Sequence, residues 1–592
     1  MATAQDKLTD TLTIDPDTIP GREALERWDA HKPDNFYDAN PLLRRLLTRL
    51  RGAEVDHKAL SGFGAIVAQA VDVLAMENDR LGNHPRVERF DGLGTRLEGV
   101  VFHPTYHAAG KPAYDAGVIA CLKEPGMTWF QSTLFYLLGH CGEMGHLCPI
   151  TCTSGLVRAV QQKGSAELKE KWLPGLLTAS YEEKLHGSQF LTEVQGGSDV
   201  GSNILVARKS GGAAAPFRLY GEKWFCSVAD GDLFIVTARP EGAPEGTAGL
   251  GCFLVPRRLD DGKPNHFALR RLKDKIGTRT LATAEIDFEG SYAWPVGRLD
   301  EGFKIAVGVV LNTSRFMNAL GCASAMRRAY LEAASYAAFR EAFGAPILKY
   351  PLVRETLAIM KTEEAAALLS SFYLSELIDL MDKGEATEED EAAHRILVNV
   401  NKYWTSVMAS DVTRRGIEVL GGNGTIETFS VMPRLYRDAI VLEAWEGSHN
   451  VLCMQVLRDA QKLGLFDVVD RRLRDLAGKA KPRFAEEIAT LETAWSALRP
   501  KLDRCLKDAA YAATHVKRHL ESLMQAFQNA VLFEQAAWDA EQGETTDTAA
   551  MARFHQRRWL DPAYRADEDP DYLAGIDAVL AGDPIFPESA SM

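Results

Sequence analysis

Hydrophobic positions in the first part of the chain recur at helical spacing. Runs such as ALSGFGAIVAQAVDVLAMEND (59–79) and WFQSTLFYLLGHCGEM (129–144) place apolar residues three and four apart, which predicts helices with a buried face. The polar stretch from Asn83 to Gly110 is expected to be a loop, and KEKWLPGL (169–176) is expected to end a helix at a proline turn. The first block is therefore expected to be all-α.

The pattern changes after Lys184. Short stretches rich in β-branched and aromatic residues, FRLYGEKWF, LFIVTA, GCFLVP and ATAEIDF, alternate with Gly, Asp and Pro clusters, which predicts a β domain. Helical periodicity returns from Gly302 to Leu457 and continues to about Ala540, before a tail rich in Asp, Pro and Gly. We expect four domains: 1–185, an N-terminal extension and helical domain; 186–295, a β domain; 296–460, a helical bundle; and 461–592, an appended helical domain with an acidic tail.

The overall composition is ordinary for a soluble globular protein, with 46% hydrophobic and 25% charged residues. The first residues carry acids and prolines without an apolar run, so we expect no secretory signal or transit peptide. No apolar stretch has the length and continuity of a transmembrane helix. Nine scattered cysteines suit reduced thiols, and we expect a cytoplasmic protein.

One cluster contains possible metal ligands. His140, Cys141, His146, Cys148 and Cys152 fall within thirteen residues, and all of them are residue types that bind zinc or iron. Their spacing matches no Cys-x-x-Cys pair, so we expect tight helix packing here and no metal.

The appended region has an uneven charge distribution. Residues 471–518 contain twelve Lys or Arg against six Asp or Glu, although the whole chain has a net charge of −14. One interpretation is a solvated helical face, and the other is a surface that meets nucleic acid, lipid or a protein partner. The overall charge argues only against a surface built wholly for nucleic acid.

The loop LEAWEGSHNVL (442–452) holds the strongest catalytic candidate. Glu446 lies between Trp445 and Gly447, and burial against an indole raises a carboxyl pKa toward the range of a general base. The alternative is a structural carboxylate beside the amides of a helix N-terminus. From this loop alone both interpretations stay open.

Two further segments contain candidate ligand contacts. QFLTEVQGGSDV (189–200) places Thr192 and Ser198 around a Gly-Gly pair, where hydroxyls and free amides suit the polar edge of a heterocycle; an ordinary turn is the alternative. EKWFCSV (222–228) places Trp224 and Cys226 on one face of a predicted strand, where they either cover a ring system or belong to the core.

Six motifs in order give the chain a resemblance to the acyl-CoA dehydrogenase family of flavoproteins across residues 40–457. They are LTEVQGGSD (191–199), GEKWFCS (221–227), LKDKIGTRTLATAEIDF (272–288), FREAFG (339–344), IEVLGGNG (417–424) and YRDAIVLEAWEGSHN (436–450). CPIT (148–151), TEVQGGSDVGSN (192–203), RLKDK, Pro351 and WEGS resemble its AidB-like branch. The resemblance implies an α+β multidomain fold: an N-terminal helical domain, a β-barrel-like middle domain and a C-terminal four-helix bundle, here with appended helices.

The resemblance also implies FAD as cofactor and assigns roles by position. Flavin contacts match Gln189, Leu191, Thr192, Gly197 and Ser198 on one side, Trp224, Cys226 and Ser227 on the other, and Ser448 and Asn450 behind the base. Arg340 and Phe343 match residues that reach the adenine half of FAD across a subunit interface, and Glu418, Gly421 and Gly422 match the loop that meets the same group. Substrate contacts match Ser198, Arg315, Trp445 and Gly447.

Four residues depart from the family pattern. Cys226 stands in place of a threonine, and a thiol is a weak hydrogen-bond partner. Asn312 replaces an acidic residue three positions before Arg315, while Glu418 and Pro351 replace glutamines near the ADP group. These changes leave FAD expected and weaken the expectation of ordinary CoA binding.

The implied reaction is α,β-desaturation of an acyl-CoA, with Glu446 as the base. The resemblance further implies an electron-transferring flavoprotein as acceptor and a homo-oligomer, either dimer or tetramer. Two alternatives stay open at this stage: an AidB-like flavoprotein that binds double-stranded DNA with little turnover, and a flavin oxidase that reacts with oxygen.

Overall fold

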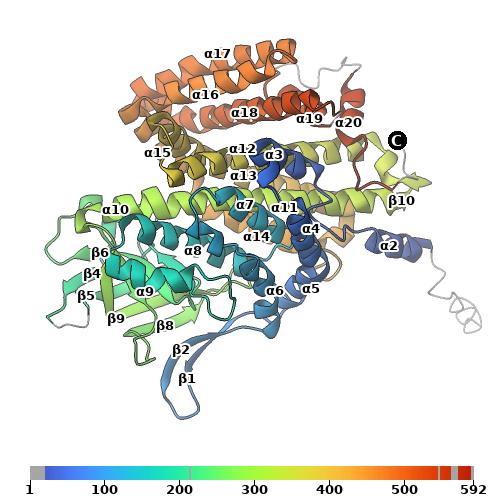
Figure 1. Ribbon diagram of the computed structural model, residues 1–592. Helices are drawn as coiled ribbons and strands as arrows, with labels where there is room; N and C mark the ends of the chain where they lie inside the picture. The colour runs from blue at the N-terminus through green and yellow to red at the C-terminus, as the bar shows by residue number, and fades with distance from the viewer. Residues whose placement is uncertain (1–19, 212–214, 545–546, 562–570, 588–592) are drawn as a thin grey trace, which may run out of the picture.

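The computed structural model describes residues 20–211, 215–544, 547–561 and 571–587 (Figure 1). The first part is mainly helical, because its apolar residues recur on one or more helix faces. Its helices pack around α7 and α8, whose side chains are buried on nearly every side. The elements are α2 (Pro20–Ala30), α3 (Pro41–Arg51), α4 (His57–Ile66), α5 (Asp72–Asn78), α6 (Pro104–Asp115), α7 (Thr128–Gly139), α8 (Met144–Lys163) and α9 (Ala166–Leu176).

The expectation that residues 83–110 form a loop is wrong. It contains an antiparallel hairpin, β1 (Arg86–Phe90) and β2 (Arg96–Val101), which projects from the body in Figure 1, and the start of α6. The hairpin residues are mostly exposed, so apolar alternation is weak and the sequence pattern resembles a loop. The predicted proline turn is also wrong, because Pro174 lies inside α9.

The middle part is a closed β structure. β6 pairs with β4 and β7, and β5 and β9 complete the circuit, so the inward side chains form a separate apolar core. Phe190, Leu219, Phe234, Phe253 and Phe267 lie in this core. The strands are β3 (Gly187–Phe190), β4 (Val206–Lys209), β5 (Phe217–Ser227), β6 (Leu233–Pro240), β7 (Gly251–Pro256), β8 (Phe267–Leu272) and β9 (Thr283–Pro295).

A second helical bundle follows, and its central helix α11 crosses the molecule between the β structure and the appended helices (Figure 1). Gly384, at a φ of 70°, ends α12, and a capping box between Thr387 and Asp390 begins α13, so the acidic stretch 384–391 forms the turn and the first helical residues. The helices are α10 (Gly302–Ile305), α11 (Asn312–Phe339), α12 (Pro351–Lys383), α13 (Glu388–Leu420), α14 (Met432–Ala444) and α15 (His449–Leu463). A short hairpin, β10 (Glu341–Ala342) and β11 (Ala345–Pro346), follows α11.

Among the described residues, two helical stretches meet the length and composition of a membrane span, namely His57–Asn78 and Leu299–Phe339. The second has 72% of its apolar window buried and contains α11, so its hydrophobicity serves the protein core. The first is 33% buried in its window, and Phe63, Val67 and Val71 pack into the same core.

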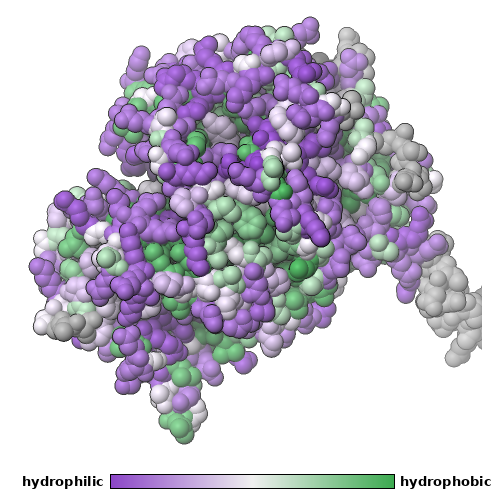
Figure 2. Space-filling view, in the orientation of Figure 1, coloured by the Kyte–Doolittle hydropathy of each residue, from purple (hydrophilic) through white to green (hydrophobic). Residues whose placement is uncertain are grey.

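The appended helices lie on the opposite side of α11 and α12 from the β structure (Figure 1). Helix α18 packs on α12 and on α16, and the surface of this region drawn in Figure 2 is largely hydrophilic. Helical structure continues beyond the expected limit near Ala540, because the described residues there include α19 and α20. The elements are α16 (Leu465–Ala480), α17 (Ala485–Lys507), α18 (Ala509–Glu541), α19 (Thr548–Trp559) and α20 (Tyr572–Leu580).

Many of the basic residues in 471–518 form ion pairs within the protein. Arg472 contacts Asp390 at 2.6 Å, Lys479 contacts Glu534 at 2.7 Å, and further pairs engage the cations at 471, 474, 481, 499 and 504. These cations face carboxylates, as i,i+4 pairs for Arg474 and Arg504 and between helices for most of the others. The solvated structural interpretation of the basic run is therefore favoured over a phosphate-binding surface.

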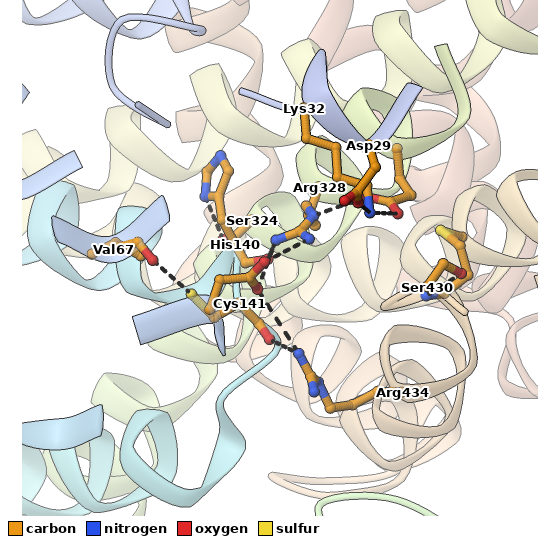
Figure 3. Close-up of polar contacts among 12 residues, drawn as sticks. Asp29, Lys32, Val67, His140, Cys141, Ser324, Arg328, Ser430 and Arg434 are labelled. Carbon is orange, nitrogen blue, oxygen red and sulfur yellow. Dashed lines mark hydrogen bonds and ion pairs between the residues drawn. The ribbon is translucent and has the colours of Figure 1, made fainter. Parts of the chain in front are cut away.

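Three members of the His/Cys cluster, His140, Cys141 and His146, are buried and hydrogen-bonded to their neighbours, and Figure 3 shows the first two. The carbonyl of His140 and the carboxylate of Asp72 accept from the buried Arg328, and the Cys141 thiol donates to Val67 O at 3.6 Å. The ring of His146 contacts the carbonyl of Tyr106 at 2.7 Å. Within the described ranges no group of three His, Cys, Asp or Glu side chains is placed to hold a metal ion.

Candidate active site

A cavity of about 770 Å³ lies where the β structure meets the helices, a size typical of ligand sites. Its walls come from α8, the 189–201 loop, the end of β5, the start of α11 and the loop between α14 and α15. Most predicted site residues line it: Gln189, Leu191, Thr192, Gly197, Ser198, Ser227, Arg315, Trp445, Glu446, Gly447, Ser448 and Asn450.

Glu446 presents one carboxylate oxygen without a partner in this cavity. Gln189 Nε2 donates to Glu446 Oε1 at 3.2 Å, and Ser314 Oγ accepts from the same amide nitrogen at 2.9 Å. Glu446 Oε2 is shielded from solvent and has no hydrogen-bond partner among the described residues. Burial raises the pKa of Glu446 to about 7, against the opposing effects of two nearby cations, Arg315 and Lys402. This carboxyl has the position and the pKa of a general base.

Arg315 connects the base to the start of α11. Its Nε donates to the carbonyl of Glu446 at 3.0 Å, and its Nη1 donates to Asn312, Asn399 and Gln455 at 3.2, 2.8 and 3.1 Å. All of these acceptors are neutral, and burial lowers the pKa of Arg315 to about 10. Asn312, noted above as a departure from the family pattern, therefore serves as an acceptor for this buried guanidinium.

A buried ion pair between Lys223 and Glu193 fixes the glycine-containing loop 191–198. Lys223 Nζ contacts Glu193 Oε1 at 2.9 Å and donates to the carbonyl of Leu191 at 2.9 Å. Glu193 also accepts from the backbone N–H of Ile204 at 2.7 Å. A Cβ on Gly197 would lie 2.4 Å from Thr192 Oγ1, so a larger residue here would displace the Thr192 side chain. The loop is thereby fixed with its hydroxyls facing the cavity.

The structure does not bring Trp224 and Cys226 to the wall of this cavity. Cys226 is fully buried in the β core, and neither it nor Trp224 lines the cavity, whereas Phe225 and Ser227 do. The register between β5 and β9 shifts between Lys223 and Cys226, and this bulge changes the faces that strict alternation assigns. Trp224 instead lies under Lys273, whose Nζ is 3.6 Å from the ring centroid.

Five predicted FAD contacts lie outside the cavity wall. Phe343 is 97% exposed at the turn between β10 and β11, with a φ of 52°. The others lie at the end of α11 or around the end of α13: Arg340, Glu418, Gly421 and Gly422. Their role toward FAD held by a second subunit stays a prediction.

Several residues of the site were missed by the sequence reasoning. Lys275, Phe225 and Arg458 line the cavity, and burial lowers the pKa of Lys275 to about 8. Lys223 is a lysine at an inward position of a predicted strand, a signal that calls for a buried carboxylate partner. Arg458 gave no comparable signal, because its position depends on how α15 packs.

Comparison with known proteins identifies the class. Three family models match in succession: the adaptive response protein AidB N-terminal domain over 28–183, the acyl-CoA dehydrogenase middle domain over 188–291, and the acyl-CoA dehydrogenase C-terminal domain over 300–461. The chain belongs to the acyl-CoA dehydrogenase family, flavoproteins that use FAD and act on CH–CH bonds. The expected family, fold class and cofactor are confirmed.

Individual relatives cover most of the chain. A putative acyl-CoA dehydrogenase, AidB of Escherichia coli K12, is 32% identical over 75% of this chain and 82% of its own length. Acyl-CoA dehydrogenase family member 11 of Caenorhabditis elegans is 28% identical over 88% of this chain and 87% of its own. Its crystal structure with C11-CoA has a TM-score of 0.79 at 26% identity, covering 88% of this chain and 91% of that one. The Bd2924 apo-form has a TM-score of 0.78 at 27% identity, with coverage of 85% and 98%.

The cavity suits the flavin part of FAD. Hydroxyls of Thr192, Ser198, Ser227 and Thr283 line it and match the polar edge of an isoalloxazine. The close turn at Gly197 leaves backbone next to the cavity instead of a side chain. Apolar walls from Leu191 and neighbouring side chains complete a site for a flat, partly polar ring.

Proposed function

We propose that this protein is an FAD-dependent acyl-CoA dehydrogenase that converts an acyl-CoA to its trans-2-enoyl-CoA. The observation that carries this proposal is the unpartnered Oε2 of Glu446, which lies in the cavity while Gln189 holds Oε1. The C11-CoA bound to the nematode relative supports acyl-CoA as the substrate class.

Glu446 removes the proton from the carbon next to the thioester carbonyl. With a pKa near 7 it is ionised at neutral and higher pH and is still basic enough to take that proton. The backbone N–H of Glu446 has no acceptor among the described residues, and it donates to the thioester oxygen to stabilise developing charge there. Apolar side chains around Trp445 exclude water from the reacting carbons.

FAD, when bound, supplies the acceptor for the hydride that leaves the β-carbon. The residues that would hold its flavin end are the loop 191–198, Ser227, and Ser448 with Asn450 behind the base. Arg340, Phe343, Glu418, Gly421 and Gly422 of a second copy would hold its adenine end, which would make the protein a homo-oligomer. An electron-transferring flavoprotein would take the electrons, and the cytoplasm is the compartment proposed for this reaction.

Behind the base lies a narrow apolar space of about 20 Å³, which is smaller than an acyl chain. This space shares Cys148, Trp445 and Glu446 with the main cavity and continues to Phe135 and Met317. The indole N–H of Trp445 donates to Asn318 Oδ1, which fixes the ring across the entrance. The apolar lining suits the end of a saturated acyl chain, and the rest of the chain would lie in the main cavity.

The test is anaerobic reduction of the purified flavoprotein by butyryl-, isovaleryl- and undecanoyl-CoA, followed by loss of the oxidised flavin absorbance. We expect at least one thioester to bleach the wild type, and Glu446→Gln to retain FAD and bind the same thioester without bleaching. Equal bleaching rates for the two proteins would remove Glu446 from the role of base. The matched control is Glu385→Gln, which changes an exposed carboxyl in the turn after α12 that does not line the cavity.

A further inference from the structure

The loop that carries Glu446 has an unfavourable backbone conformation. Glu446 has a φ of 59° and Gly447 a φ of 102°, so two successive residues adopt positive φ. A left-handed conformation is unfavourable for glutamate, and such residues persist only where surrounding contacts fix them. The contacts that fix this loop therefore bear directly on the position of the base.

Two buried cations, Arg315 and Lys402, fix this loop by donating hydrogen bonds to its carbonyl oxygens. Arg315 on α11 donates to the carbonyl of Glu446 at 3.0 Å. Lys402 on α13 donates to the carbonyls of Glu443 and Gly447 at 3.0 and 3.2 Å. The first of these carbonyls belongs to the last turn of α14, where a positive charge is favourable. Lys402 thus joins the end of that helix to the residue after the base.

Lys402 is an unusual group to bury. Its side chain is fully enclosed, and among the residues that the structure describes it has no carboxylate ion-pair partner. A buried ammonium held only by carbonyl oxygens is expensive, and burial lowers the pKa of Lys402 to about 8. A methionine would fill the same space without this cost. The charge is therefore kept for a purpose other than packing.

The geometry points to Lys402 as a positioning residue for the base, which rests on the function proposed above. Lys402 holds the Glu446 loop in its left-handed bend through two carbonyls and supplies a buried positive charge that favours the ionised carboxylate. It touches neither the cavity nor the carboxylate oxygens, so it acts through the loop. The titratable groups that face Lys402 come from each neighbouring element: Cys322 and Arg315 on α11, Glu443 on α14, Glu446 in the loop, and His449 on α15.

The charge of Lys402 determines the direction in which its removal shifts the pKa of Glu446. Lys402 lowers the pKa of Glu446 against the larger effect of burial, so removing its charge raises that pKa. The acid limb of the rate profile should then move to higher pH by about one unit in Lys402→Met. Loss of the two carbonyl hydrogen bonds should also displace the base and lower kcat by about a hundredfold, with a much smaller change in KM.

The experiment compares FAD-loaded wild type, Lys402→Met and Lys402→Arg in two measurements. The first is the pH dependence of anaerobic bleaching by the best of the three acyl-CoAs. The second is amide hydrogen exchange of peptides covering 442–452, which does not depend on activity. We expect Lys402→Met to show the shifted acid limb and faster exchange in this loop, and Lys402→Arg to recover part of both. Lys462→Met, at an exposed site on α15, is the control and should leave both measurements unchanged.

Two results would overturn this inference. One is a Lys402→Met protein whose loop exchange and acid limb match those of the wild type. The other is a lower Tm with exchange increased uniformly over the whole chain, which marks a general packing defect. If Lys402→Met does not fold, Lys402→Gln decides in its place. Its amide can still donate to the carbonyls but carries no charge, so an acid limb at the wild-type pH in that variant would overturn the inference. If no acyl-CoA bleaches the wild type, the proposed function fails, while the exchange measurement still tests whether Lys402 holds the loop.

Discussion

The buried Lys223–Glu193 pair gives a quantitative prediction about the cofactor site. Its nitrogen and oxygen lie 2.9 Å apart, and the two side chains are 0% and 1% exposed. Removing one partner of such a pair typically costs about 3–5 kcal/mol, because a charge is left buried and unpaired. In Lys223→Met the Glu193 carboxylate retains donors from Ile204, Leu205 and Gln195. We therefore expect a loss at the lower end, about 3 kcal/mol of unfolding free energy.

The effect of Lys223→Met on the 191–203 segment and on FAD binding should exceed its effect on the stability of the whole protein. Lys223 also donates to the carbonyl of Leu191, which begins the loop that lines the cavity, so its loss should loosen the 191–203 segment and weaken FAD binding. The assays are urea unfolding of the apoprotein and titration of the apoprotein with FAD. The double variant Lys223→Met/Glu193→Gln should recover part of the stability, because no unpaired charge remains. A loss below about 1 kcal/mol in Lys223→Met, with unchanged FAD affinity, would refute the reasoning.

Two further predictions concern pH and nucleic acid. The rate of flavin reduction by acyl-CoA should increase as the pH rises through about 7. Glu446 must lose its proton to act as base, and burial sets its pKa near that value. A rate constant that is flat from pH 5.5 to pH 8, about the range in which that group titrates, would contradict this prediction. The protein should not bind double-stranded DNA at moderate salt, because much of the basic run in 471–518 is paired with carboxylates. A gel shift that persists at about 0.2 M salt would contradict this prediction.

The periodicity of the chain predicted the order of helical, β and helical parts because each burial pattern is set locally. It missed the hairpin at 86–101, where neither face is deeply buried and alternation is therefore weak. It missed the helices beyond Ala540 because Asp and Gly in that tail resemble a loop, while Met551 and Phe554 are buried by tertiary packing. The local sequence pattern does not show which residues tertiary packing will bury.

The candidate site was predictable where a motif fixes both residue and backbone. Glu446 and the loop around Gly197 are such cases, and the structure places both at one cavity. Cys226 lies in the β core and not at the cavity, next to a bulge that the local sequence pattern does not reveal. Lys402 lies 44 residues before the base in an ordinary-looking helix, and only the packing of α13 against α14 shows its role.

The base role of Glu446 is tested most directly by following the α-proton itself. An acyl-CoA that reduces the flavin is prepared with deuterium at the α-carbon and mixed anaerobically with wild type and with Glu446→Gln. We predict slower reduction of the wild type by the deuterated thioester than by the ordinary one, and release of the label to water. The variant should release none above the level without enzyme. Release of the label by Glu446→Gln at the wild-type rate would contradict the account.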